Sequence, residues 1–146
     1  MDKNKKFKIL EKIATADIAF EAYGKTLSEL FESSALATTS VMVDVKDLKS
    51  EIKKDIKLQN EDIERLLFDF LNEIVFLKDA EMMLFKEFKA DVKEKNKEFY
   101  LNAVLSGEKI NPHKQNLKID IKAITLHMFK VEKLNGRFKA TVVLDI

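Results

Sequence analysis

Hydrophobic and polar residues alternate near both ends of the chain and follow helical spacing in between. Near the N-terminus, residues 7–13 and 18–23 alternate with a period of two, which predicts two strands. The clearest alternation comes last, over residues 119–131 and 138–146. Asn135-Gly136 lies between these last two runs and is a strong hairpin signal, because both residues tolerate positive φ. We therefore expect a hairpin at the C-terminal end.

Two segments have the spacing of amphipathic helices. Thr26 and Glu29 stand in the arrangement of a capping box, which predicts a helix from Thr26 to about Val41. A second apolar face runs over residues 63–75, and Asn60 precedes it as a candidate N-cap. This second helix is the more hydrophobic one, so we expect it to form the centre of the core.

Further strands are predicted around and after the second helix. Residues 51–59 alternate, and residues 84–93 and 99–106 have the pattern of a hairpin that turns around Lys95-Asn96-Lys97. A polar stretch that contains Pro112, from Ser106 to Leu117, is predicted to be a loop.

The predicted order is two strands, a helix, a strand, a helix and four strands. Antiparallel strands with two helices indicate an α+β fold, which we expect to be a two-layer sandwich of a mainly antiparallel sheet with two helices on one side. The length fits one domain over residues 1–146, and we expect residues 1–6 to form a frayed end.

Composition narrows the classes of protein that fit. The chain is 46% hydrophobic and 35% charged with one proline and three glycines, which is typical of an ordered soluble protein. The net charge of +1 gives no overall field that would favour DNA or an anionic membrane. Without cysteine there is no disulfide, thiolate zinc site or cysteine nucleophile, and a reducing cytoplasm fits. No apolar run reaches the length of about 18 residues that a membrane span needs.

Two aspartates stand at the ends of apolar strands, where a charge needs a partner. Asp17 opens the second predicted strand and Asp145 closes the last, with the main-chain carboxylate of Ile146 beside it. Three carboxylates brought together repel one another unless a cation or a basic side chain neutralises them. Oxygen ligands alone suit a hard ion such as Ca²⁺ or Mg²⁺. Alternatively, Asp17 caps a turn and Asp145 is a solvated strand end, since periodicity does not place the two ends side by side.

Two other polar residues stand on the predicted strand of residues 119–131. Lys122 is polar between Ile121 and Ala123; it is either a surface lysine or, beside the carboxylates, a point charge for a phosphate or a carboxylate. His127 falls on the apolar side of the strand, so we expect a buried, structural histidine. No phosphate-binding glycine loop, nucleophile elbow or two-histidine metal helix is present, so we expect no catalytic residues.

Six stretches form an ordered set along the chain: TADI, AYGKTLSELFESSALA, DIERLLFDFLNEIVFL, SGEKI, IKAIT followed by His127, and VVLDI at its end. Taken together, these stretches resemble the archease family. They occur in the family's order and spacing over nearly the whole chain, which supports the α+β expectation with an archease-like fold.

The resemblance implies a function as well as a fold. Archeases are accessory proteins of RtcB-type RNA ligases in tRNA splicing and RNA repair; they promote metal-dependent guanylylation of the ligase by GTP and so support multiple turnover. By this resemblance the protein is not an enzyme, its partner is the ligase, and it meets RNA only indirectly. The family's metal site maps onto Asp17, Asp145 and Ile146, with Lys122 as a functional polar residue.

The chain departs from the family pattern at five positions and keeps the acidic and lysine positions. Residues of the family's polar ring are replaced by Ile13, Ala14, Gln115, Leu117 and Leu126. Two alternatives to ligase activation therefore remain. One is a small metal-dependent phosphoester hydrolase, and the other is a protein-binding or chaperone module that lost the ligase role.

Overall fold

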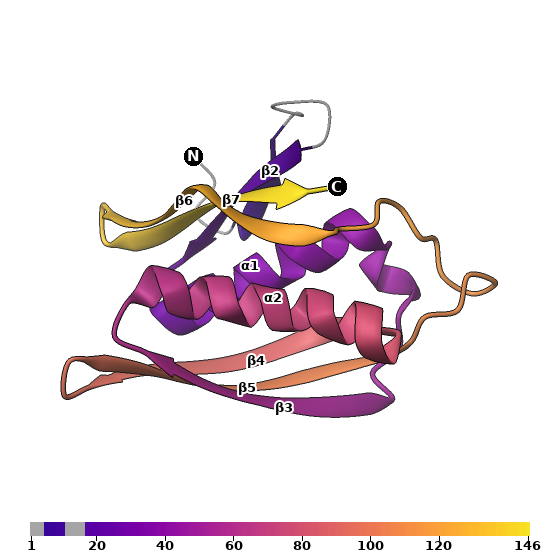
Figure 1. Cartoon of the computed structure of the whole chain (residues 1–146), viewed down its shortest axis with the longest axis horizontal. Coiled ribbons are helices and arrows are strands. Elements are labelled where there is room, and N and C mark those ends of the chain that lie inside the picture. The colour runs from indigo at the N-terminus through magenta and orange to yellow at the C-terminus, as the bar shows by residue number, and fades with distance from the viewer. Residues whose placement is uncertain (1–4, 11–16) are drawn as a thin grey trace.

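A computed structural model describes residues 5–10 and 17–146 (Figure 1). The elements follow one another as β1 (Phe7–Ile9), β2 (Asp17–Gly24), α1 (Leu27–Met42), a 3₁₀ turn (Val45–Asp47), β3 (Ile52–Asn60), α2 (Ile63–Glu81), β4 (Met83–Lys95), β5 (Glu98–Lys109), β6 (Ala123–Leu134) and β7 (Arg137–Asp145). Within the described ranges, neither helix is long and apolar enough to cross a membrane.

The strands form two antiparallel sheets with the helices between them (Figure 1). One sheet has the order β1-β2-β7-β6 and the other has the order β3-β5-β4. The α+β class is confirmed. The expectation of a single sheet with both helices on one side is corrected, because there are two sheets and the helices pack against both. Alternation identifies a strand but not its neighbour, because pairing is a long-range choice.

Helix α1 begins where the capping box predicted. Thr26 Oγ1 accepts a hydrogen bond from Glu29 N at 3.1 Å, and Glu29 Oε2 accepts one from Lys25 N at 2.9 Å. The helix is buried on most sides, as its place between two sheets requires. Gly24 allows the end of β2 to approach the main chain of α1 closely, because a Cβ at Gly24 would lie 2.4 Å from Leu30 N.

The N-cap of helix α2 lies two residues after the predicted one, Asn60. Asp62 is the N-cap, and its Oδ1 accepts a hydrogen bond from Glu64 N at 2.9 Å. Asn60 instead ends β3, and its Oδ1 accepts a hydrogen bond from Asp62 N. The predicted apolar face is buried, and Phe70 stacks on Phe31 of α1 with ring centroids 5.8 Å apart. This contact joins the two helices at the centre of the core.

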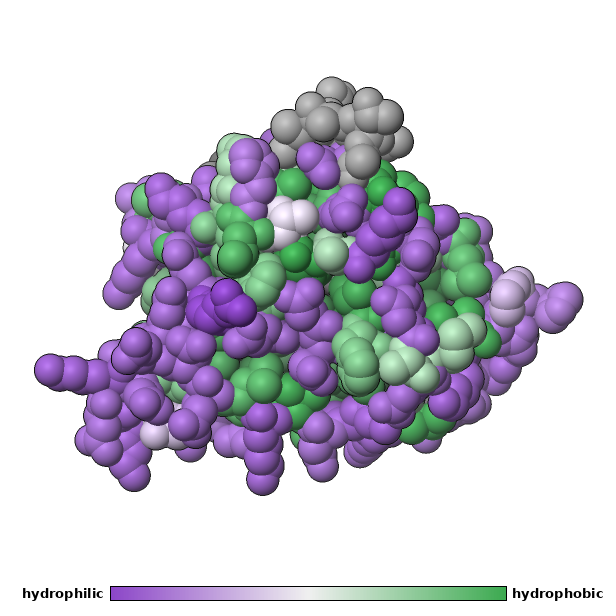
Figure 2. Space-filling model, in the orientation of Figure 1, coloured by the Kyte–Doolittle hydropathy of each residue, from purple (hydrophilic) through white to green (hydrophobic). Residues whose placement is uncertain are grey.

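Both predicted hairpins are present. Strands β4 and β5 are joined by Asn96 and Lys97, and β6 and β7 by Asn135 and Gly136; all four residues have positive φ. The loop predicted from Ser106 begins later, because β5 continues to Lys109. Figure 2 shows hydrophilic side chains crowded over the free end of the β4–β5 hairpin.

Helix side chains bind the main chain of two edge strands. On β4, Ala90 N donates to Glu32 Oε2 and Val92 N donates to Ser28 Oγ, each at 2.9 Å. On β6, Val131 N donates to Glu64 Oε2 at 2.8 Å. These bonds satisfy main-chain donors that have no strand partner, and they connect the helices to one edge of each sheet.

The N-terminal segment is hydrogen-bonded to the sheet already at Lys5 and Lys6, which were expected to belong to a frayed end. Of the residues expected to fray, Lys6 accepts a hydrogen bond at its carbonyl from Tyr23 N at 2.7 Å. The carbonyl of Lys5 accepts one from Arg137 Nη2 at 3.4 Å. The predicted first strand is present as β1, while its expected continuation over residues 11–13 lies outside the described residues.

Candidate functional site

Strand pairing brings the two candidate aspartates together. In the antiparallel β2–β7 ladder, Asp17 is the register partner of Asp145, and on the other side Asp145 is the partner of Ala123 in β6. Side chains directly opposite one another in such a ladder lie on one face with Cβ atoms about 5 Å apart. The two carboxylates therefore stand side by side, and alanine is their small neighbour. Both aspartates are half-buried.

The remaining candidates lie next to this pair. Lys122 N donates a hydrogen bond to the main-chain oxygen of Asp145 at 2.8 Å, and the lysine side chain is exposed. Ile146 directly follows Asp145, is half-buried and packs against the core. The structure thus brings Asp17, Asp145, Ile146 and Lys122 to one end of the β2–β7 pair.

The carboxylate oxygens at this end of the sheet are suitable ligands for a hard cation whose other ligands include water molecules. Like charges directly opposite one another are destabilising, so a cation between Asp17 and Asp145 would remove a repulsion. Carboxylate oxygens are ligands that Ca²⁺ and Mg²⁺ prefer. Among residues 5–10 and 17–146, no three His, Cys, Asp or Glu side chains gather as a metal site. The described side chains therefore supply two carboxylates, and main-chain oxygens and water would supply the rest.

His127 is exposed, which corrects the expectation of a buried histidine. The β6–β7 ladder shifts register between Thr125 and Lys130, so the residues between them leave the regular pairing. Met128 takes a left-handed φ of 56°, and Leu126 and Met128 are 58% and 59% exposed. This irregularity breaks the alternation that had placed His127 on the core side. In addition, β6 begins at Ala123, four residues later than the strand predicted from residue 119.

One of the departures from the family pattern has a clear structural role. Gln115 is buried, and its Nε2 donates to Glu108 Oε1 at 2.7 Å and to the Lys109 carbonyl at 3.0 Å. Its Oε1 accepts a hydrogen bond from Asn111 N. Gln115 thus holds the loop that leads towards Lys122. Ile13 and Ala14 lie outside the described residues.

Sequence reasoning missed Lys78, which anchors the segment before Lys122. Its side chain is nearly buried, and Nζ contacts Asp120, the Ile121 carbonyl at 2.8 Å and Asp79 at 2.8 Å. Burial lowers the pKa of Lys78, but hydrogen bonds and charges from Asp120 and Asp79 outweigh it and raise the pKa above its usual value. Lys78 thus stays charged at neutral pH. No local pattern distinguishes it from a surface lysine near a helix end.

Replacing Lys78 by methionine should lower the free energy of unfolding by about 1–2 kcal/mol, because the buried Ile121 carbonyl loses its donor. Methionine keeps the apolar part of the side chain, and the exposed aspartates regain water. Urea denaturation measures the change. The matched control is Lys54→Met, which removes a half-exposed pair with Glu81 and should cost less than about 1 kcal/mol. Equal losses in the two variants would show that Lys78 is no anchor.

Comparison with known proteins identifies the family of the chain. The sequence pattern of the Archease protein family (MTH1598/TM1083) matches residues 7–146. A protein archease of Pyrococcus furiosus is 41% identical over 133 residues, which span 90% of this chain and 94% of that protein. One of Methanosarcina mazei is 38% identical over 143 residues, 97% of each chain.

Solved structures show the same fold. The solution structure of Methanobacterium thermoautotrophicum protein 1598 is 35% identical, with a TM-score of 0.85 over 96% of this chain and 98% of that one. The crystal structure of an archease from Thermotoga maritima, described as a possible chaperone, is 25% identical, with a TM-score of 0.62 over 91% and 93%. A matching pattern over residues 7–146 and relatives that span nine-tenths of the chain establish that this chain belongs to the archease family.

Proposed function

We propose that the protein is a non-catalytic activator of an RtcB-type RNA ligase, which promotes guanylylation of the ligase by GTP and supports its multiple turnover. The observation that carries this proposal is the pairing of Asp17 with Asp145, with Lys122 hydrogen-bonded beside them. These residues come from three segments that lie far apart in the sequence, and their proximity supports the site that the archease resemblance implies.

Each residue of the site has a separate part in this proposal. Asp17 and Asp145 would hold a Ca²⁺ or Mg²⁺ ion, and the main-chain carboxylate of Ile146 would add a third anionic oxygen. When bound, the ion supplies positive charge near phosphate or carboxylate groups of the ligase site. The exposed side chain of Lys122 extends from the same end of the sheet and can place a second positive charge there.

The proposal also includes partner and location. The ligase is the protein partner, RNA is met through the ligase, and the cytoplasm is the compartment. A second candidate is a protein-binding chaperone role, which is favoured by the description of the Thermotoga maritima archease as a possible chaperone. Co-purification with a protein other than the ligase, combined with no effect on guanylylation, would support the second candidate.

Lys122→Ala should lower the rate of ligase guanylylation about tenfold, which corresponds to about 1.4 kcal/mol in the barrier. The measurement is incorporation of labelled GTP into purified ligase with substoichiometric amounts of the protein. The melting temperature should stay nearly unchanged, because an exposed lysine contributes little stability. Lys114→Ala is the control, since Lys114 is exposed in the loop that precedes Lys122. Full activation by folded Lys122→Ala would make Lys122 an ordinary surface lysine.

A further inference from the structure

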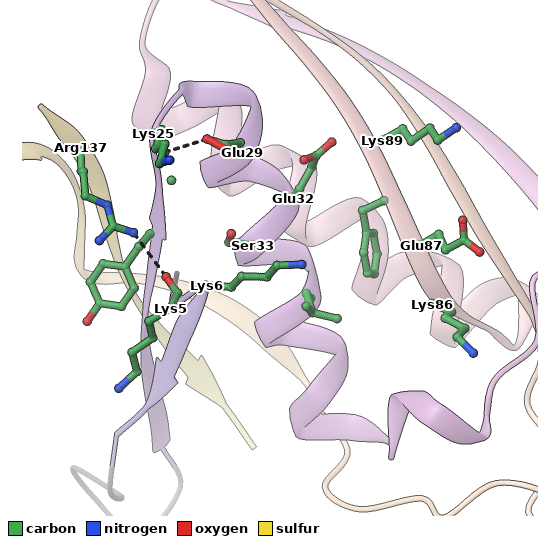
Figure 3. A pocket seen from close by; sticks show the side chains of 14 residues that line it. Lys5, Lys6, Lys25, Glu29, Glu32, Ser33, Lys86, Glu87, Lys89 and Arg137 are labelled. Carbon is green, nitrogen blue, oxygen red and sulfur yellow. Dashed lines mark hydrogen bonds between the residues drawn. The ribbon is translucent and has the colours of Figure 1, made fainter. Parts of the chain in front are cut away.

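A groove crosses the outer side of α1, between the β1-β2-β7-β6 sheet and strand β4 (Figure 3). Its volume is about 610 Å³, which lies in the range of small-molecule sites. Its floor is one stripe of α1 at spacings of three and four residues, made of Glu29, Glu32, Ser33 and Leu36. One wall comes from the N-terminal segment, the end of β2 with Lys25 after it, and the start of β7. The other wall comes from β4.

The groove has a local excess of positive charge. Six of its lining residues are basic, namely Lys5, Lys6, Lys25, Lys86, Lys89 and Arg137, against three glutamates. The whole chain carries only +1. Within the described ranges, none of these six side chains is in an ion pair, although ion pairs are common elsewhere. No carboxylate among the described residues neutralises their charge, although Lys86 Nζ donates to the Leu48 carbonyl at 3.2 Å.

The three glutamates of the groove, in contrast, are committed to the fold. Glu29 accepts from Lys25 N, Glu32 accepts from Ala90 N, and Glu87 accepts from Ser50 Oγ. Each of these bonds uses one carboxylate oxygen. The second oxygen of Glu29 and of Glu32 remains an acceptor at the floor, where a ligand's N–H or O–H group can reach it.

Arg137 has donor capacity that the fold leaves unused. Its guanidinium carbon lies 5.8 Å from the centre of the Tyr23 ring, and its Nη2 donates to the Lys5 carbonyl. Its Nε is buried and finds no acceptor among residues 5–10 and 17–146, which is rare for a strong donor. Burial, and then the hydrogen bond to Glu21, raise the pKa of Tyr23 to about 12, so its ring adds no charge beside the arginine.

We propose that this groove binds a nucleotide, either a free mononucleotide or one unit of an RNA strand. Phosphate oxygens match the basic wall, where an arginine fork and mobile lysines are suited to them. Ribose hydroxyls or base amino groups match the free oxygens of the glutamates on the floor. An acidic peptide would also satisfy the wall through its carboxylates, so it is the competing ligand that the experiment includes.

The groove is separate from the paired aspartates. Gly24, which lines the groove, pairs with Phe138 at one end of the β2–β7 ladder, and Asp17 pairs with Asp145 at the other end. Seven residues of extended chain separate these ends by about 23 Å. The groove proposal therefore does not depend on the cation site or on ligase activation, and the two are tested by different variants.

Calorimetry and amide chemical shifts test the proposal on the full chain, with EDTA present to remove divalent cations. The probes are GTP, AMP, a single-stranded hexaribonucleotide, inorganic phosphate and an acidic hexapeptide. We expect the nucleotides to bind more tightly than phosphate and to shift the amides of Gly24, Lys25 and Arg137. Affinity that rises from AMP to the hexamer identifies an RNA strand, and equal or tighter binding of the mononucleotides identifies a free nucleotide.

Matched variants connect the binding to the groove. Lys25→Gln and Arg137→Gln should each weaken nucleotide binding at least about fivefold, because each removes a phosphate partner. Two controls should leave nucleotide binding unchanged: Lys57→Gln, at an exposed lysine on β3 outside the groove, and Asp17→Asn at the other end of the β2–β7 ladder. In Glu32→Gln the amide oxygen still accepts from Ala90 N, so the fold is kept. Because this variant removes a negative charge from the floor, it should bind phosphate more tightly. The ratio of the dissociation constants of phosphate and nucleotide should become smaller.

Three results would overturn the proposal. The first is no saturable nucleotide binding at millimolar concentration by the folded chain. The second is equal weakening by Lys25→Gln and Lys57→Gln, which would indicate general attraction to lysines. The third is phosphate or the acidic peptide binding as tightly as every nucleotide, since the floor would then contribute nothing. Lys25 is exposed, so its variant remains informative even if Arg137→Gln fails to fold.

Discussion

Gly107→Ala should lower the free energy of unfolding by about 3 kcal/mol or more, at the upper end of what overpacking costs. A Cβ at Gly107 would lie 1.9 Å from the Leu84 carbonyl oxygen and 2.6 Å from Phe85 Cα. Both atoms belong to the main chain of β4, so no side chain can rotate away. Gly107 is in the central strand of its sheet, paired with Ile52 and Phe85, and relief requires the strands to separate.

Thermal unfolding measures this effect, with an expected loss of about 10 °C in melting temperature. The control is Gly136→Ala in the β6–β7 turn. Gly136 has a φ of +77°. Its two chain neighbours aside, no atom of the described residues lies within 4 Å of the position that its Cβ would take, so only the conformational cost of about 1 kcal/mol applies. A Gly107→Ala protein as stable as Gly136→Ala would show that β4 and β5 do not approach this closely.

The second large effect is expected at the paired aspartates. Asp17→Asn and Asp145→Asn should each weaken Ca²⁺ or Mg²⁺ binding about tenfold, since each replaces an anionic ligand by a neutral one. Because both act on one site, the double change should cost less than the sum. Calorimetry measures the binding, and Asp55→Asn, an exposed aspartate on β3, is the control. If neither ion binds the unaltered protein at millimolar concentration, the shared cation is wrong, and a lysine such as Lys122 becomes the better partner for Asp17.

Stability gives an independent readout of the same pair. Without divalent cations, Asp145→Asn should be slightly more stable than the unaltered protein, because a cross-strand repulsion is gone. With Ca²⁺ or Mg²⁺ the order should reverse, because ligand binding stabilises only the intact site. Residues appended after Ile146 should weaken the ion's effect, while residues added at the N-terminus should not. A constant order of stability in both conditions would contradict a cation held by these carboxylates.

Local features were predictable because local chemistry determines them. The cap at Thr26, the apolar face of α2 and the Asn135-Gly136 turn each depend on residues within a few positions of one another. Asp17 and Asp145 could each be placed at a strand end in the same way. That they face each other depends on strand pairing across most of the chain, so only the family resemblance pointed to it.

Other features had no signal in a local pattern. The division of strands between two sheets is a choice among distant partners, and alternation is the same whichever partner is chosen. The shift in β6 depends on the left-handed backbone of Met128, a residue type that rarely adopts it, so His127 was placed on the wrong side. Lys78 differs from a surface lysine only through Asp120 and Ile121, more than forty positions away.

The bonds from α1 to β4 have a consequence for how copies of the protein meet one another. Glu32 and Ser28 accept the hydrogen bonds of the Ala90 and Val92 amides. These amides would otherwise be free to bind the carbonyls of an incoming strand. A second chain can pair with this stretch of β4 only after α1 has moved away from it. Aggregation through this edge is therefore coupled to loosening of the helix layer, and collisions between folded molecules do not start it.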